Sequence, residues 1–431
     1  MFGISSRRRH AVAGLAVAAI IAAPVLSACG SSSGSSGGGG SAGSGSSAGK
    51  YSPAPLKLSA AEQGSILKKA FLTDSVSAGS INPVILQGLR EAGRSYTAAQ
   101  VARAWACQSQ ATCKIGSGSQ TIAYLDGSGG NLWREITRAA ITLEAEDYPN
   151  IGTVMYLNAA GSLQTMQADL KTLIARRVTA IVTYDDFGAA MTASFQAAKT
   201  AGIPIAAFGG TPGPTAVSAV VTQVQSSFCS DGVQMAQTTA KMLSNHGNVA
   251  FFTGTPGNPQ GAGWESCAAS WFTKNAPGIK VVDKSNTGWS NSGTVSATSA
   301  LISTGKKVNA ILYDYANQTV NIVQTYQHAK QTVPDQVTWT TDNQLLQLWQ
   351  QDQKSSDPWQ LADSSSINFE GSIALAAVMD HLSGKSVAST LTFPLPFVQA
   401  RSGDYNASQP ADGPGPTLMP DGLLSKLLSS S

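Results

Sequence analysis

The stretch Thr121–Asp147, TIAYLDGSGGNLWREITRAAITLEAED, contains the pattern that decides the fold. A short apolar run ends at Asp126, a glycine-rich turn follows, and an amphipathic helical pattern begins near Asn131. This order of strand, turn and helix is the first unit of an α/β fold. Open α/β sheets bind ligands beyond the carboxyl ends of their strands, so we expect Asn131 and Trp133 to lie at a binding face.

The same alternation continues along the chain in two series. Strands alternating with helices of this length predict βαβ units, and two series predict two doubly wound parallel-sheet lobes. The first series has strand-like runs at 121–125, 151–157, 179–183, 203–208 and 216–221, and helical patterns at 131–147, 162–177 and 187–201. The second has strand-like runs at 248–253, 279–283, 309–313, 337–341 and 359–363, and helical patterns at 228–245, 260–275, 292–304, 317–330 and 344–352. A helix at 369–383 and an extended segment at 391–400 close the pattern.

These patterns predict the boundaries of the lobes and of the segments around them. Residues 119–225 and about 366–388 form the predicted N-terminal lobe, and residues 226–365 and about 389–401 form the C-terminal lobe. Residues 51–118 predict a small helical extension, with helices starting near Ser59, Asn82 and Thr97. Residues 402–431 are rich in Pro, Gly and Ser and predict a poorly ordered tail, apart from a short pattern at Leu423–Leu428.

The N-terminus has the features of an export signal over residues 1–28. A charged region at Arg7–His10 precedes an apolar region at Ala11–Val25 that is short for a bilayer-spanning helix. Leu26–Gly30 resembles the bacterial lipobox, which implies a lipoprotein anchored through Cys29 on the extracytoplasmic face of the membrane. An ordinary signal peptide and a retained membrane helix are the alternatives. Residues 29–50 are mostly Ser, Gly and Ala, and predict a flexible tether with a reach of roughly 25 Å.

The charge balance argues against nucleic-acid binding. Charged residues make up only 12% of the chain, and the formal charge of +3 comes from Arg7, Arg8 and Arg9 in the predicted signal. Removing these three of the 28 basic residues leaves 25, which equals the 25 acidic residues. Nucleic-acid binding needs clustered cations that displace counterions.

The four cysteines that remain beyond Cys29 suggest disulfides, because an even number in an exported protein usually forms them. Four cysteines allow three connectivities, and buried free thiols are the alternative. We favour Cys107–Cys113, which are close in sequence, and Cys229–Cys267, which both lie in the second predicted lobe.

Neither a metal site nor an enzyme is predicted. The four histidines are scattered and no cysteine pair has zinc-ligand spacing. The turn after Asp126 lacks the third glycine of a dinucleotide fingerprint, since Leu132 occupies that position, so we expect no cofactor.

Several segments resemble the type I periplasmic binding proteins, the ribose-binding-like solute receptors of ABC importers. The likeness covers roughly residues 120–400, and Asn131–Arg134 is similar to the Asn-x-Trp-Arg turn of actinobacterial sugar-type lipoprotein receptors. It implies two hinged lobes that close on a small ligand, and a monomer that presents its closed form to an ABC permease. The segments that carry the likeness are Ile122–Trp133, Gln167–Leu170, Val178–Val182, Ala201–Ile205, Asn248–Gly254, Ile279–Val282, Val308–Ile311 and Phe369–Gly371.

The resemblance also implies ligand-binding residues at the strand ends of both lobes. Sugar receptors stack aromatic rings on the C–H faces of the ligand and direct hydrogen bonds to its hydroxyl groups. Helix capping is the alternative role for Asn131, Asp185 and Asp342, and a core position is the alternative for Trp133. The matching positions are Asn131, Trp133, Tyr184, Asp185 and Phe208 in the first lobe, and Trp264, Tyr313, Asp314, Asn317 and Asp342 in the second.

Two positions depart from the pattern of the family. Gly209 and Gly210 stand where an aspartate is usual, and Trp264 stands where an arginine is usual and could add a second stacking surface. In the family the aspartate and the arginine hold a simple pentose. Because both are replaced here, we expect a different or bulkier sugar or polyol as the ligand. The tryptophans from Trp271 onward are expected to be structural. The alternative function is a ligand sensor that hands its closed form to a membrane signalling partner.

Overall fold

The computed structural model of the protein describes residues 50–210, 217–411 and 413–430. The predicted signal, the lipidation residue Cys29 and nearly all of the tether lie outside these residues. Within the described ranges, no helix is both long enough and apolar enough to cross a membrane.

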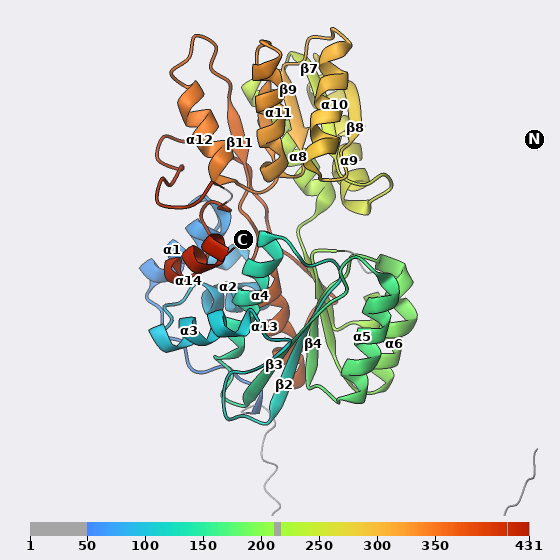
Figure 1. Ribbon diagram of the computed structural model, residues 1–431, viewed down its shortest axis with the longest axis vertical. Coiled ribbons are helices and arrows are strands. Elements are labelled where there is room, and N and C mark those ends of the chain that lie inside the picture. The colour runs from blue at the N-terminus through green and yellow to red at the C-terminus, as the bar shows by residue number, and fades with distance from the viewer. Residues whose placement is uncertain (1–49, 211–216, 412, 431) are drawn as a thin grey trace, which may run out of the picture. The chain divides into compact units, whose positions relative to one another are not determined.

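The first lobe is built on a seven-stranded sheet with the order β1-β3-β2-β4-β5-β6-β12. Figure 1 shows β2, β3 and β4 side by side in this sheet. All neighbouring strands are parallel except β1, which runs antiparallel to β3. The fifth strand of the first series is β6, C-terminal to the predicted 216–221. The strands are β1 (Thr112–Lys114), β2 (Gln120–Asp126), β3 (Ile151–Asn158), β4 (Ala180–Tyr184), β5 (Ile205–Phe208), β6 (Thr222–Gln225) and β12 (Thr390–Thr392).

Alternate residues of these strands point to opposite faces, and helices cover both faces. Ile122 and Tyr124 of β2 join a core with α4 and α13, whereas Ala123 and Leu125 join a separate core with α5 and α6. A strand buried on both sides explains the uninterrupted apolar run of this stretch. The helices are α4 (Leu132–Ala145), α5 (Leu163–Ala175), α6 (Thr192–Thr200) and α13 (Glu370–Leu382).

The second lobe is built on a six-stranded sheet with the order β13-β11-β10-β9-β7-β8. Only β13 runs antiparallel to its neighbour. Its strands are β7 (Gly247–Thr253), β8 (Ile279–Asn286), β9 (Ala310–Tyr313), β10 (Asp335–Thr338), β11 (Leu361–Asp363) and β13 (Val398–Gln399). Its helices are α8 (Phe228–Met242), α9 (Pro259–Asn275), α10 (Asn291–Ser303), α11 (Ala316–His328) and α12 (Asn343–Asp352). The two doubly wound lobes predicted from the sequence are confirmed.

Three segments join the lobes, and one of them differs from the predicted boundaries. The chain passes between the sheets after β6, after β11 and after β12. The sequence pattern placed about 389–401 wholly in the second lobe, but Thr390–Thr392 pairs with β6 in the first sheet. An extended segment read in isolation does not reveal which sheet edge it joins.

The N-terminal extension packs on the first lobe through α1 (Ala60–Phe71), α2 (Pro83–Ala92) and α3 (Ala98–Cys107). Ser59 with Glu62, and Thr97 with Gln100, form capping boxes that start α1 and α3. Gly88 of α2 lies so near α13 that a Cβ would be 2.6 Å from the Cα of Ile373. The extension is therefore part of the core of the first lobe.

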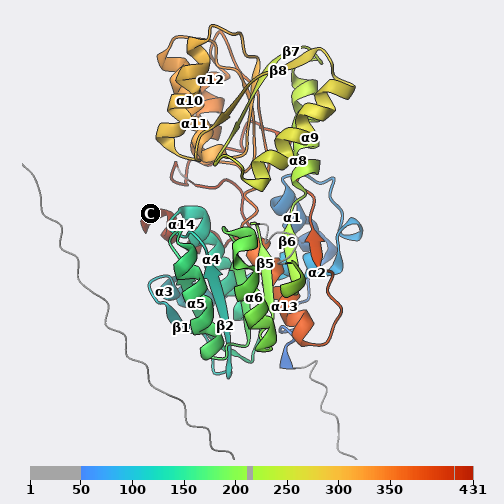
Figure 2. The same ribbon diagram turned by 90° about the vertical axis from the view of Figure 1, so that its right-hand side faces the viewer.

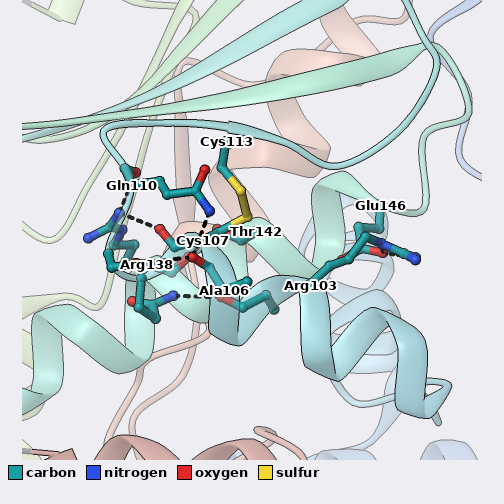
Figure 3. The surroundings of a disulfide bond; sticks show 11 residues. Arg103, Ala106, Cys107, Gln110, Cys113, Arg138, Thr142 and Glu146 are labelled. Carbon is teal, nitrogen blue, oxygen red and sulfur yellow. Dashed lines mark hydrogen bonds and ion pairs between the residues drawn. A yellow bond between two sulfur atoms is a disulfide. The ribbon is translucent and has the colours of Figure 1, made fainter.

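Both predicted disulfides are present. Cys107–Cys113 joins the end of α3 to β1, with Cα atoms 5.4 Å apart, and Cys229–Cys267 joins α8 to α9, with Cα atoms 5.2 Å apart. Beside the first of them, Arg138 of α4 donates hydrogen bonds to the backbone carbonyls of Cys107 and Gln110 (Figure 3). The bridge ties α3 to β1, which pairs with β3, and Arg138 attaches the loop between the two cysteines to α4.

The C-terminal segment is more ordered than its composition predicts. Residues 421–430 form helix α14 (Asp421–Ser430), which lies against α3 and α4 (Figure 2). Leu423, Leu424, Leu427 and Leu428 are buried there. The helix lies at the short pattern Leu423–Leu428 that the sequence analysis set apart from the rest of the tail, and its apolar stripe docks on the first lobe.

Candidate functional site

Both sheets have a switch point, where the chain reverses its direction of travel across the sheet. It lies between β2 and β4 in the first lobe and between β7 and β9 in the second. Ligands of such sheets bind outside the carboxyl ends of the strands at this point. A buried aspartate lies there in each lobe, Asp126 at the end of β2 and Asp314 directly after β9.

Asp126 organises the turn after β2. Its Oδ1 accepts hydrogen bonds from the backbone N–H groups of Ser128 (3.3 Å) and Gly129 (3.2 Å), and its Oδ2 accepts one from the hydroxyl of Tyr156 (3.2 Å). Gly129 has a φ of +48°, and a Cβ there would overlap the side chain of Asn158. The hydrogen bonds of Asp126 and the backbone conformation of Gly129 therefore fix the glycine-rich turn that precedes α4.

Arg134 neutralises this end of the first sheet. Its guanidinium contacts Asp126 Oδ1 at 2.7 Å and Asp186 Oδ1 at 2.9 Å, and it is buried. It also lies over the ring of Tyr184, 3.4 Å from the centroid. Arg134 was quoted in the sequence motif without a role of its own. Because both carboxylates hold it, it is a support for Tyr184 and offers no free cation to a ligand.

Trp133 and Tyr184 form a fixed aromatic pair above Arg134. Their rings meet edge to face, with centroids 5.7 Å apart, and both side chains are half-buried. The indole N–H of Trp133 donates to the carbonyl of Ser366 at 2.6 Å, in the segment that crosses between the lobes. The pair is thus held by Arg134 from one side and by the hinge from the other.

Gly209 and Phe208 complete the support of Tyr184. Phe208 is fully buried, with its ring edge-to-face to Tyr184 at 5.3 Å. A Cβ at Gly209 would overlap the Tyr184 ring, and the φ of Gly209 is +66°. The glycine that replaces the usual aspartate of the family therefore makes room for this ring. Direct ligand contact by Phe208, which the resemblance implied, is withdrawn because its side chain has no exposed surface.

Asn131 and Asp185 both bind backbone N–H groups. The side chain of Asn131 caps α4 by accepting from the N–H of Arg134 at 3.0 Å. Asp185 Oδ1 accepts from Phe187 at 2.9 Å and from Gly188 at 3.0 Å. Burial raises the pKa of Asp185 to about 6. Asn131 is exposed, so capping leaves part of its amide accessible, whereas Asp185 is almost fully enclosed.

Asp314 in the second lobe is surrounded by neutral donors. Its Oδ2 accepts from the hydroxyl of Thr253 at 2.6 Å and from the indole of Trp264 at 3.0 Å, and its Oδ1 accepts from the indole of Trp289 at 2.7 Å. Burial raises the pKa of Asp314 to about 6, although these hydrogen bonds oppose part of the rise. Asp314 therefore holds the two indoles in place.

Trp264 and Tyr313 lie in the core of the second lobe. Trp264 is fully buried, 5.1 Å from the ring of Phe251, and the hydroxyl of Tyr313 bonds Thr287 at 2.6 Å. The prediction that Trp264 adds a stacking surface is wrong, and direct contact by Tyr313 is withdrawn for the same reason. Trp264 lies on α9 with its ring against Phe251 of β7. The packing of α9 on the sheet decides this orientation, and the sequence pattern does not.

Trp289, which the sequence analysis expects to be structural, lies beside Asp314 at the edge of the second sheet. It is half-buried, follows β8, and its ring covers Gly254 at the end of β7, where a Cβ would overlap it. Its φ of +49° places it in the left-handed region, which is uncommon for a large residue. Its contacts with Asp314 and Gly254 agree with a structural role, and its half-buried ring also keeps part of its surface accessible.

Asn317 and Asp342 lie together at the same edge of the second sheet. The amide of Asn317 donates to Asp342 Oδ2 at 3.1 Å, and Asp342 Oδ1 caps α12 by accepting from Leu345 at 2.9 Å. Asp342 is buried, whereas Asn317 and the neighbouring Tyr315 are half-buried. Asn317 is thus the more accessible polar group of the two.

Comparisons with known proteins agree with this architecture. A family model described as "Periplasmic binding protein domain" matches residues 122–386. The periplasmic binding protein of the arabinose ABC transporter from Shewanella sp. ANA-3, bound to L-arabinofuranose, has a TM-score of 0.59 and 16% identity, over 65% of this chain and 92% of that one. A solute-binding protein from Actinobacillus succinogenes 130z with bound D-allose has a TM-score of 0.57 and 19% identity, over 65% and 97%.

A third similar structure comes from a signalling protein. The fructose-binding periplasmic domain of a hybrid two-component system has a TM-score of 0.56 and 17% identity, over 65% of this chain and 90% of that one. A search of curated proteins found no match. The solved structures show a shared fold, and the family match extends over more than half of the sequence. The chain belongs to the periplasmic binding protein family, of type I fold.

Proposed function

We propose that this protein is a lipid-anchored extracytoplasmic receptor that captures a neutral sugar or polyol between its lobes and delivers it to an ABC permease. The observation that carries the proposal is the aromatic pair of Trp133 and Tyr184, held rigidly at the switch point of the first lobe. Aromatic faces of this kind suit the apolar C–H faces of a sugar ring. Because the pair is fixed before the ligand arrives, binding costs little further ordering.

The second lobe supplies complementary groups in this proposal. Trp289 offers part of an indole ring, and Asn317 with Asp342 offers an amide and a carboxylate for ligand hydroxyl groups. Asp314 acts indirectly, by orienting Trp289. The sugars and the sugar-like ligands bound by proteins of similar fold support this ligand class.

The charge of the site favours a neutral ligand over an anionic one. Arg134 is the cation of the first-lobe site, and Asp126 and Asp186 already pair with it. A phosphate or carboxylate on the ligand would meet these carboxylates and Asp185, beside a guanidinium that is already paired. Sugar phosphates and sugar acids are therefore outside the proposed ligand class.

A thermal-shift screen of residues 30–431 against L-arabinose, D-allose, myo-inositol, D-fructose and a sugar phosphate tests the binding proposal. At least one neutral compound should raise the unfolding temperature, and the sugar phosphate should not. Trp133→Ala combined with Asp342→Ala should abolish the shift, whereas Trp133→Phe keeps an aromatic face and should retain part of it. The absence of a shift across a broad panel of neutral sugars and polyols would contradict the proposal.

The lipid anchor rests on the lipobox-like segment at Leu26–Gly30 and on the Ser- and Gly-rich segment after it. Incorporation of radiolabelled palmitate into the full chain, and its loss in Cys29→Ser, would test it. Release of Cys29→Ser protein into the medium is the expected second result.

A sensor that presents its closed form to a membrane signalling partner is the second candidate function. The similar fold of a fructose-binding domain from a hybrid two-component system favours keeping it. Deleting the gene separates the two. Uptake of the ligand found in the screen should be lost for an importer component, whereas a sensor would leave uptake intact and abolish a ligand-induced response.

A further inference from the structure

We propose that residues 401–411 and 413–430, together called the C-terminal strap, tie the second lobe to the first beside the hinge and limit how far the lobes open. The strap lies beyond residues 122–386, the part of the chain that matches the family. It also follows β13, the last strand of either sheet. The inference concerns the motion of the lobes in the ligand-free protein and does not depend on which ligand binds.

Asn343, the first residue of α12, anchors the strap to the second lobe. Its backbone N–H donates to the carbonyl of Gly413 at 2.8 Å. Its side-chain Nδ2 donates to the carbonyls of Asn406 (3.0 Å) and Pro410 (3.1 Å), and its Oδ1 accepts from the N–H of Asn406 at 2.9 Å. Asn343 is 1% exposed. Hydrogen bonds made by one enclosed amide to several backbone groups hold this part of the strap in a single conformation.

The middle of the strap lies against the hinge. The hydroxyl of Ser366, in the segment that links β11 to α13, donates to the carbonyl of Pro414. Gly415 has a φ of +71°, and a Cβ there would overlap the side chain of Thr341. The strap therefore passes directly over residues next to Asp342, and Ser366 also accepts the hydrogen bond of Trp133.

Helix α14 anchors the other end of the strap to the first lobe. Leu423 and Leu424 are fully buried, and Leu427 is 1% exposed. They pack with Ala104 of α3 and with Ile136, Ala139 and Leu143 of α4, the helix that begins at the Asn131–Trp133 turn (Figure 2). The two ends of the strap are thus fixed to different lobes by different forces, hydrogen bonds on one and apolar packing on the other.

The link between the two anchors is short. From Gly413 to Met419 the chain can span roughly 20 Å when fully extended. Lobes of this fold open by rotation about the crossing segments. A short link between two enclosed anchors lets the lobes rotate only as far as the link allows, unless one anchor detaches. The strap should therefore narrow the range of distances between the lobes.

Cutting the strap after folding tests this directly. A protease recognition sequence inserted between Pro416 and Thr417, where Pro416 is exposed, allows the link between the anchors to be severed. In the matched control the same sequence stands between Ser402 and Gly403, both exposed, so that cleavage leaves the chain from Gly403 onward bridging the lobes. Spin labels at Lys171→Cys on α5 and Ser299→Cys on α10, both exposed, report the distance between the lobes by double electron–electron resonance without ligand.

Cleavage after Pro416 should widen the distance distribution at least twofold and extend it to longer distances, whereas cleavage after Ser402 should leave it unchanged. An unchanged distribution after both cuts, or equal widening by both, would overturn the proposal. Leu427→Asp provides a second route, because it detaches α14 without cleavage and should give the same widening, with folding of both lobes verified by circular dichroism. Since no sugar is present, failure of the sugar screen would leave this test intact.

Discussion

At the switch point of the first lobe, Asp126 faces the guanidinium of Arg134, whereas at that of the second lobe Asp314 faces only neutral donors. Both aspartates are buried at the carboxyl edge of a sheet, and the five parallel strands around the two switch points follow the same order. A buried charge needs either a counter-charge or a complete set of hydrogen bonds. The comparison shows that one topology accommodates both solutions, and that each of them positions aromatic rings at the edge.

The two solutions differ in what they make available to a ligand. In the first lobe the positive charge supports the face of Tyr184, and so the platform depends on an ion pair. In the second lobe the carboxylate accepts from two indoles, and so Trp289 depends on a hydrogen bond to a group with a raised pKa. Stability and pH dependence should therefore be distributed unequally between the lobes.

Arg134→Ala is expected to have the largest effect. It leaves Asp126 and Asp186 without their counter-charge and removes the support of Tyr184. Breaking a buried ion pair from one side typically costs about 3–5 kcal/mol of unfolding free energy. Urea unfolding followed by circular dichroism measures it. Arg134→Lys keeps the charge without the planar fork and should recover part of the loss. A loss below about 1 kcal/mol would show that the pairs contribute little.

Asp314→Asn should change the pH dependence of stability. The pKa of Asp314 is raised from 3.8 to about 6, so its contribution to stability is fully present below pH 3.8 and is lost as pH rises through about 6. Two pH units correspond to about 3 kcal/mol. The unfolding free energy of the wild type minus that of Asp314→Asn should therefore fall by about 3 kcal/mol between pH 4 and pH 7.5.

The control for this experiment is Asp357→Asn, at an exposed position of the same lobe. Its difference from the wild type should stay flat over the same pH range. If the Asp314→Asn difference is also flat, Asp314 does not titrate as its burial predicts.

The smallest expected effect belongs to Asn131. Removing its cap from α4 in Asn131→Ala should lower the unfolding free energy by about 1 kcal/mol. Asn131→Ser retains a capping oxygen and should restore most of it. Titration with a sugar from the screen then separates the two roles of this residue. If Asn131→Ser is stable but binds as tightly as the wild type, Asn131 is a cap only; a weaker affinity places its amide on the ligand.

Much of the architecture was predictable because it follows from local patterns. In both lobes, short apolar runs typical of buried strands alternate with apolar residues at helical spacing. Capping boxes such as Ser59 with Glu62 mark the starts of helices. The site was less predictable. Phe208, Trp264 and Tyr313 lie at or near strand ends or on a helix beside them, as a ligand residue would, yet they are enclosed by the core. A rotation of one residue along a strand or helix moves a side chain from the edge into the interior.

The sequence by itself determined the fold class, the two lobes and the caps of several helices, because each depends on residues close together in the chain or on a repeating period. Only the tertiary structure decided that Arg134 supports Tyr184, that Trp289 and Trp264 share Asp314, and that the C-terminal strap bridges the lobes. Those contacts join residues that are distant in the sequence. They depend on which faces the folded elements present to one another, and periodicity alone does not specify this.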